Sequence, residues 1–150
     1  MLALSKYYLY FFLLCLIYTM IIGVIAALIP NELAAALTAL PYLGAMVSVL
    51  FIFLKQQRRA PTLQEKRRFA VGYLLIFWVF NAIGIVGSVA LFAQDDPQIW
   101  TDMLTYLQNT QFLLLILVML LLIATPLFLI TYWFYGKQAQ RMAQKMFGHI

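Results

Sequence analysis

Four long apolar stretches constrain this chain more than any other feature of its sequence. They cover about residues 7–29, 32–54, 69–92 and 112–135. A bilayer hydrocarbon core about 30 Å thick is crossed by a helix of about 20 predominantly apolar residues, so each stretch is long enough to cross it once. The runs are continuous rather than alternating, which favours helices over a transmembrane barrel. The sequence therefore predicts an all-α membrane protein with four transmembrane helices.

The composition supports this prediction. Of the 150 residues, 65% are hydrophobic and only 10% are charged, whereas a soluble domain carries about 25% charged residues. Four spans with short loops use nearly the whole chain, so we expect one membrane domain over residues 1–150, in which residues 136–150 form a basic cytoplasmic tail. The first stretch is longer than the apolar region of a cleaved signal peptide, about 7–15 residues, and is interpreted as an uncleaved anchor.

Proline positions predict where the helices end and bend. Pro30 stops the first stretch, and Asn31 can cap the second, which is expected to begin near Glu32. Pro41 and Pro126 fall inside the second and fourth stretches, where each removes one backbone hydrogen bond. Both are predicted to kink their helices.

The charged residues divide between the two ends of the predicted helices. With both termini on one side, all ten Lys and Arg residues fall on that side and four of the five acidic residues fall on the other. Basic residues next to spans are retained in the cytoplasm, so the division predicts that both termini are cytoplasmic. The basic residues are Lys6 near the start, Lys55, Arg58, Arg59, Lys66, Arg67 and Arg68 between the second and third stretches, and Lys137, Arg141 and Lys145 in the tail.

The basic loop, residues 55–68, has two predicted roles. Its six cations hold the loop in the cytoplasm and attract anionic lipid headgroups, the one ligand expected there. The sequence TLQE matches a capping box in which Thr62 caps a helix and Glu65 reaches back to it. The third helix is thus expected to start at Leu63 and to enter the bilayer near Phe69. Nothing beyond charge supports nucleic-acid binding, and none is expected.

The segment between the third and fourth stretches, residues 93–111, is too polar to cross a membrane but has helical periodicity. Apolar residues recur at helical spacing from Ile99 to Leu107, which predicts a short amphipathic helix at the periplasmic surface. A helical extension of the fourth stretch explains the pattern equally well. Contact with a partner from outside is predicted for four residues of this segment: Asp95, Asp96, Trp100 and Asp102.

One face of the predicted third helix carries small and polar residues. Asn81, Gly84 and Ser88 share this face at i, i+3 and i+7 spacing. Small residues let another helix approach closely, and the Asn81 amide is expected to form a hydrogen bond across the gap. Two interpretations stay open: the face packs against another helix of the same chain, or it is a dimer interface or a docking face for a partner.

The sequence offers no groups for catalysis. The first stretch has only Cys15, Tyr18 and Thr19 where small proton-coupled exporters depend on a buried Glu, which argues against that mechanism. The single histidine, His149, lies in the basic tail with no Cys or carboxylate at metal-ligand spacing. We therefore expect no enzyme activity, no catalytic residue, no metal site and no cofactor.

The loop between the second and third stretches reads RRAPTLQEKRRF. This R-x-P-T-x-x-E motif with a following basic run, in a chain of this length and span layout, resembles a group of uncharacterised small four-span inner-membrane proteins of gammaproteobacteria. The resemblance implies a bacterial inner membrane and two cytoplasmic termini. It implies no activity.

Two kinds of function are compatible with these residues. The first is a non-enzymatic inner-membrane protein that acts through protein–protein contacts, either as an immunity protein against a membrane-acting toxin or as an accessory subunit of a membrane complex. The alternative is a small homo-oligomeric transporter or channel in which Asn81, Ser88 and Thr125 line a polar path. The first is favoured because the spans carry few polar groups and one four-span unit seldom encloses a pore.

Overall fold

The computed structural model describes residues 2–30 and 37–148, and within these ranges it is helical with no strand. Four of its helical runs are long and apolar enough to cross a membrane: Leu4–Ala27, Leu37–Gln57, Leu63–Phe92 and Thr110–Phe147. The predicted all-α fold with four transmembrane helices is confirmed. The elements in chain order are α1 (Leu2–Ala27), a 3₁₀ turn (Leu37–Ala39), α3 (Leu40–Gln57), α4 (Leu63–Phe92), α5 (Gln98–Gln108), α6 (Thr110–Trp133), a π-helical segment (Phe134–Gln138) and α7 (Ala139–Phe147).

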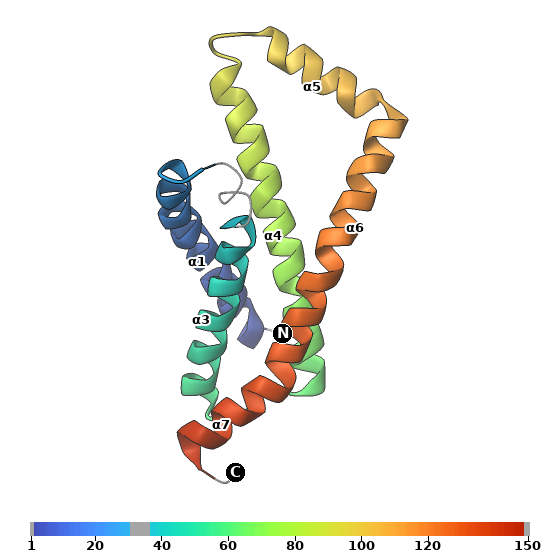
Figure 1. Ribbon diagram of the computed structural model, residues 1–150. Coiled ribbons are helices and arrows are strands. Elements are labelled where there is room, and N and C mark those ends of the chain that lie inside the picture. Colours follow the sequence, from blue (N-terminus) through green and yellow to red (C-terminus); the bar gives the residue numbers. More distant parts are fainter. Residues whose placement is uncertain (1, 31–36, 149–150) are drawn as a thin grey trace.

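The four long helices run alternately up and down, and two short helices lie at opposite ends (Figure 1). The start of α1, the α3–α4 connection and α7 lie together at what we call the basic end, because every Lys and Arg residue belongs to these segments or borders them. α5 joins α4 to α6 at the opposite, acidic end, which carries Asp95, Asp96 and Asp102. Glu32 lies outside the described residues.

The packed core sits at the basic end and consists largely of aromatic side chains. Phe69, the first residue of the apolar part of α4, is fully buried, and its ring is surrounded by five others with centroids 5.1 to 6.1 Å away. Edge-on and tilted ring pairs of this kind are the favoured geometries of aromatic contacts. These five rings belong to Tyr7 and Tyr8 of α1, Phe53 of α3, Tyr73 of α4 and Tyr135 of the π-helical segment.

Buried tyrosine hydroxyls tie the helices together through hydrogen bonds. The Tyr135 hydroxyl donates to the Met46 carbonyl oxygen over 2.9 Å and lies 2.9 Å from the Tyr73 hydroxyl. A phenol has one hydrogen to donate, so Tyr73 is the donor of the second bond. One hydroxyl pair thereby links α3, α4 and the π-helical segment, and neither hydroxyl is left without a partner, which lipid would penalise.

A second buried pair links α3 to α6 nearer the middle of the bundle. The Thr131 hydroxyl donates to the Leu127 carbonyl oxygen over 2.8 Å and lies 2.7 Å from the Tyr42 hydroxyl. Since Thr131 has given its hydrogen to the backbone, Tyr42 donates to Thr131. Interhelical bonds of this type contribute about 0.5 to 2 kcal/mol each in membrane proteins.

The start of α4 has the predicted capping box, which is confirmed. The Thr62 hydroxyl accepts a hydrogen bond from the Glu65 backbone over 3.3 Å, and the Glu65 carboxylate accepts one from the Thr62 backbone over 2.8 Å. The same carboxylate also accepts two hydrogen bonds of 2.7 Å from Arg59. Arg59 was predicted to face lipid, yet its guanidinium closes the α3–α4 turn as half of a bidentate ion pair.

Glu65 lies in the first turn of α4, before the apolar part that begins at Phe69, and its pKa is strongly shifted. The hydrogen bonds from Arg59, partly opposed by burial and helped by the Thr62 backbone, lower the pKa of Glu65 from 4.5 to about 2. The unfolded chain therefore binds a proton at Glu65 more readily than the folded chain does.

This shift predicts that stability depends on pH. The stabilisation that the Arg59–Glu65 ion pair contributes should be fully present above about pH 4.5. It should be lost progressively as the pH falls toward about 2, because the ion pair holds the carboxylate ionised in the folded state. The measurement is the unfolding midpoint in detergent across this window. Glu65→Gln should unfold at a lower denaturant concentration than the parent at pH 7, and its midpoint should change less between about pH 5 and pH 2. Equal slopes would contradict the role of the ion pair.

One of the two prolines differs from its predicted role. Pro41 lies in the first turn of α3, directly after the 3₁₀ turn, so the predicted kink inside the second helix is wrong. A proline is readily accepted there because the first turn has no intrahelical acceptor for its missing N–H. Pro126 does lie inside α6. The predicted cap at Asn31 lies outside the described residues, as does the predicted start at Glu32.

The fourth helical run is longer than the predicted span. α6 continues through the π-helical segment into α7, so the predicted boundary at residue 135 falls inside the run Thr110–Phe147. Ala139 and Ala143 of α7 are buried where α7 crosses the end of α3 (Figure 1). The predicted tail therefore begins as part of the packed basic end. His149 lies outside the described residues.

The predicted amphipathic helix between the third and fourth spans is confirmed as α5. The chain leaves helical geometry at Asn109, whose side chain accepts hydrogen bonds from the Gln111 and Phe112 backbones over 3.0 and 3.3 Å. Asn109 thus caps α6 as a separate helix. This break excludes the alternative, in which residues 93–111 simply extend the fourth helix.

Candidate functional site

The acidic half of the bundle is open, in contrast to the basic half. The buried residues of α4 are Phe69, Ala70 and Tyr73, all within its first turns, and the buried residues of α6 begin only at Leu127. The remaining lengths of α4 and α6, joined by α5, extend beyond the packed core (Figure 1). We therefore expect contacts with other molecules along this half.

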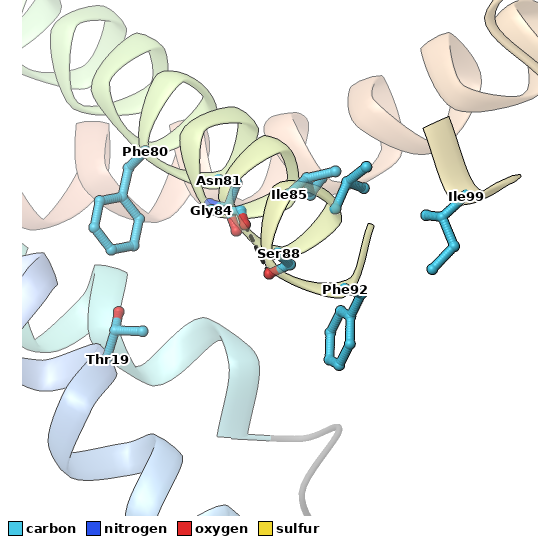
Figure 2. Close-up of a pocket in the computed structure, with 9 residues that line it drawn as sticks. Thr19, Phe80, Asn81, Gly84, Ile85, Ser88, Phe92 and Ile99 are labelled. Atoms are coloured by element: carbon cyan, nitrogen blue, oxygen red, sulfur yellow. Dashed lines mark hydrogen bonds between the residues drawn. The ribbon is translucent and has the colours of Figure 1, made fainter. Parts of the chain in front are cut away.

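A groove runs along the face of α4 that was predicted from its small residues. It encloses about 520 Å³ and is lined by side chains of α1, α4 and α5, among them Thr19, Asn81, Gly84 and Ser88 (Figure 2). A smaller cavity of about 240 Å³ continues toward the start of α3 and shares Thr19 and Asn81. We call the two together the α4 groove. The predicted face is thus brought together in one hollow, with Thr19 of α1 added.

The polar groups of this groove form hydrogen bonds within their own helix. The Asn81 amide nitrogen donates to the Phe77 carbonyl oxygen over 2.7 Å, and the Ser88 hydroxyl donates to the Gly84 carbonyl oxygen over 2.8 Å. The predicted bond from Asn81 to another helix is not formed among the described residues. The Asn81 side-chain oxygen has no donor within that part of the chain and remains an available acceptor.

The glycines show which helix contacts need small residues. A Cβ at Gly72 would lie 2.5 Å from Tyr8, and one at Gly44 would lie 3.2 Å from Tyr18, so both glycines permit packing within the chain. A Cβ at Gly84 or Gly87 would meet no atom of the described part of the chain within 4 Å. Among the described residues, packing against another helix of this chain therefore does not explain the small residues Gly84 and Gly87.

The four residues predicted for contact from outside all lie at the acidic end and are exposed: Asp95, Asp96, Trp100 and Asp102. Asp96 accepts a hydrogen bond from the Gln98 backbone over 3.0 Å and so stabilises the start of α5. Asp102 lines an apolar cavity of about 630 Å³ between α4, α5 and α6. Ile85 and Ile99 line both this cavity and the α4 groove.

The six cations of the basic loop divide into two groups. Arg59 is held by Glu65, and the Lys66 ammonium lies 3.6 Å from the centre of the Tyr132 ring, a cation–π contact. The other four are exposed, and in the described part of the chain their side chains have no hydrogen-bond, ion-pair or ring partner: Lys55, Arg58, Arg67 and Arg68. Only these four are free to meet lipid.

Comparison with known proteins gives no further guide: the chain matches no protein-family model, no curated protein and no solved structure. Among residues 2–30 and 37–148, no three His, Cys, Asp or Glu side chains lie close enough together to hold a metal ion. Cys15 is buried, and its thiol lies 3.9 Å from the Pro41 carbonyl oxygen. The α4 groove and the exposed cations are therefore the candidate binding features of the described residues.

Proposed function

We propose that this chain is a non-enzymatic, multi-pass protein of the bacterial inner membrane that acts by binding another membrane protein through the α4 groove. The observation that carries this proposal is that the small-residue face of α4 is open: among residues 2–30 and 37–148, no atom lies within 4 Å of a Cβ built at Gly84. An immunity protein against a membrane-acting toxin and an accessory subunit of a membrane complex are the two roles that such a protein would fill.

The chemistry of the groove favours a transmembrane helix as the partner. Helices associate in lipid by close packing at small residues and by polar bonds, because lipid tails are as apolar as leucine. Gly84 and Ser88 provide the close approach, and the Asn81 side-chain oxygen provides an acceptor without a donor in the described part of the chain. A partner helix with a small face and one hydroxyl or amide donor fits these features.

The proposed orientation places the basic end in the cytoplasm and α5 in the periplasm. The charge division between the two ends supports it, since basic residues next to spans are retained inside. In this orientation the exposed Asp95, Asp96 and Trp100 would meet a partner or toxin that arrives from outside, next to the outer mouth of the α4 groove.

A single bulky residue in the groove tests this proposal. Gly84→Leu should still fold, since a Cβ at this position meets no atom of the described residues within 4 Å and the rest of the side chain enters the groove, but it should abolish recovery of the partner, because a leucine keeps two helices apart. The measurement is site-specific photo-crosslinking from position 88 in living cells, followed by identification of the adduct. Gly87→Leu is the matched control, since Gly87 is equally open but does not line the groove.

Three outcomes would contradict the proposal. They are a crosslink that survives Gly84→Leu, one that Gly87→Leu removes equally, and an absence of any protein adduct. An added deletion experiment separates the two roles: loss of the gene should sensitise cells to a neighbouring toxin if the protein confers immunity, and should instead impair a membrane complex if it is an accessory subunit.

The alternative, a homo-oligomeric transporter or channel, lacks support in the geometry. Its proposed polar path needs Thr125 beside Asn81 and Ser88. Thr125 instead donates its hydroxyl to the Leu121 carbonyl oxygen of α6 over 2.8 Å and does not line the cavities that contain the other two. Purified protein in liposomes is expected to conduct no ions.

A further inference from the structure

A second hollow lies at the basic end, where α1 crosses the beginning of α4. It encloses about 410 Å³, and its walls combine cations with apolar groups. We call it the arginine groove. The residues that line it are Tyr8 of α1 and Arg67, Arg68, Val71, Gly72 and Leu75 of α4.

The shape of the arginine groove is fixed by a close contact between the two helices. The Tyr8 hydroxyl donates to the Arg68 carbonyl oxygen over 3.0 Å, which holds the ring against α4. A Cβ at position 72 would lie 2.5 Å from the Tyr8 ring, so only glycine allows this approach. The groove is therefore a built feature of the α1–α4 contact rather than a chance gap between side chains.

The charge at the mouth of the groove is uncompensated. Glu65, the one acidic residue in this loop, is saturated by Arg59, and Lys66 is turned onto Tyr132. Arg67 and Arg68 are exposed, and in the described part of the chain neither guanidinium has a hydrogen-bond or ion-pair partner, although the charge of Arg68 acts on the nearby Tyr8 hydroxyl. Two adjacent guanidiniums without a protein carboxylate form a site for an anion, and phosphate is the anion whose geometry they match best.

Below the arginines the groove becomes apolar. Val71 and Leu75 follow Arg67 by one and two helical turns on the same side of α4, about 6 and 12 Å further along its axis. Both are well exposed, at 48% and 60%. A soluble phosphate ion makes no use of such walls, whereas a phospholipid places its phosphate at the headgroup level and its acyl chains alongside.

We propose that the arginine groove binds one anionic phospholipid of the adjacent leaflet. Its phosphate bonds to Arg67 and Arg68, and one acyl chain lies along Val71, Gly72 and Leu75. This site goes beyond the proposed function: it lies at the opposite end of α4 from the open face and needs no protein partner.

Two charge-matched variants test the site. Arg67→Gln with Arg68→Gln and Lys55→Gln with Arg58→Gln each remove two exposed cations from the same loop. A basic residue near an anionic surface contributes about fivefold to affinity, so the first pair should weaken binding of phosphatidylglycerol about 25-fold, and the second should weaken it less than about fivefold. The measurement is native mass spectrometry of the detergent-solubilised full chain titrated with phosphatidylglycerol, with phosphatidylcholine as the neutral comparison.

Two further arms keep the result decisive if the charge variants fold poorly. Val71→Trp keeps every cation but fills the apolar part of the groove, and it should reduce phosphatidylglycerol retention at least about fivefold, the same scale as losing one cation. Inorganic phosphate at millimolar concentration should not displace the lipid. Equal losses in both charge-matched pairs, full retention in Val71→Trp, or displacement by inorganic phosphate would each overturn the lipid site.

Discussion

Replacing Phe69 with alanine is expected to destabilise the protein by about 2 to 4 kcal/mol. Large-to-small changes at buried phenylalanines cost about 3 to 5 kcal/mol in soluble cores. Lipid is itself apolar, so the transfer part of this cost falls, while the cavity and the lost ring contacts remain. Phe69 is fully buried and packs against rings of α1, α3 and the π-helical segment, so a cavity there loosens three helix contacts together.

Phe92→Ala is the matched control, because Phe92 stands in the same helix and is 65% exposed. Its cost should stay within about 0.5 kcal/mol, as for surface substitutions. The measurement is reversible unfolding in mixed detergent micelles, followed by the near-ultraviolet signal of the buried tyrosines. If Phe69→Ala and Phe92→Ala cost the same, the aromatic cluster is not what holds the basic end together.

The sequence predicts the helices well because they follow from local rules. Lipid demands about 20 apolar residues per span, and four such runs are visible without any knowledge of packing. The cap at Thr62 depends on residues only three positions apart, and it is present as predicted. The predicted kink at Pro41 is wrong because the prediction depended on a helix that begins near Glu32. α3 begins at Leu40, eight residues later, so Pro41 falls in its first turn.

The aromatic core was not predictable, because it depends on how the helices cross. Tyr7 and Tyr135 are far apart in the sequence, and each lies near a span end, where tyrosine usually belongs to an interfacial belt. In the structure both are buried, and Tyr135 bonds to Met46 on α3. A tyrosine near a span end can turn to the headgroups or to a neighbouring helix, and sequence spacing alone does not distinguish the two.

The candidate sites, like the fold, were predictable only where they depend on spacing along one helix. Helical spacing correctly placed Asn81, Gly84 and Ser88 on one face, but Thr19 joins their groove only because α1 crosses beside α4. The loop cations were predicted as one group. Their separation into held and exposed members rests on Arg59 reaching Glu65 and on Lys66 reaching Tyr132, and the second of these contacts joins residues 66 positions apart.

Moving the exposed cations is expected to change the orientation of the whole chain. Lys and Arg near span ends set orientation by their position. A variant with glutamine at the four exposed loop positions and lysine in place of Asp95 and Asp96 removes cations from the basic end, which the proposed orientation places in the cytoplasm, and adds cations to the acidic end. It keeps Arg59 and Lys66, so the contacts of the folded loop survive. The four loop positions are Lys55, Arg58, Arg67 and Arg68.

Two reporters fused after α7 measure this change: a fluorescent protein that matures only in the cytoplasm and a phosphatase that is active only outside. The parent should give fluorescence alone, and the variant should gain phosphatase activity as fluorescence falls. The control exchanges Lys and Arg at the same four positions, which preserves every positive charge and should preserve the orientation. If the variant stays purely fluorescent, the basic residues that it retains must set the orientation, and the exposed loop cations would then be free to serve lipid binding alone.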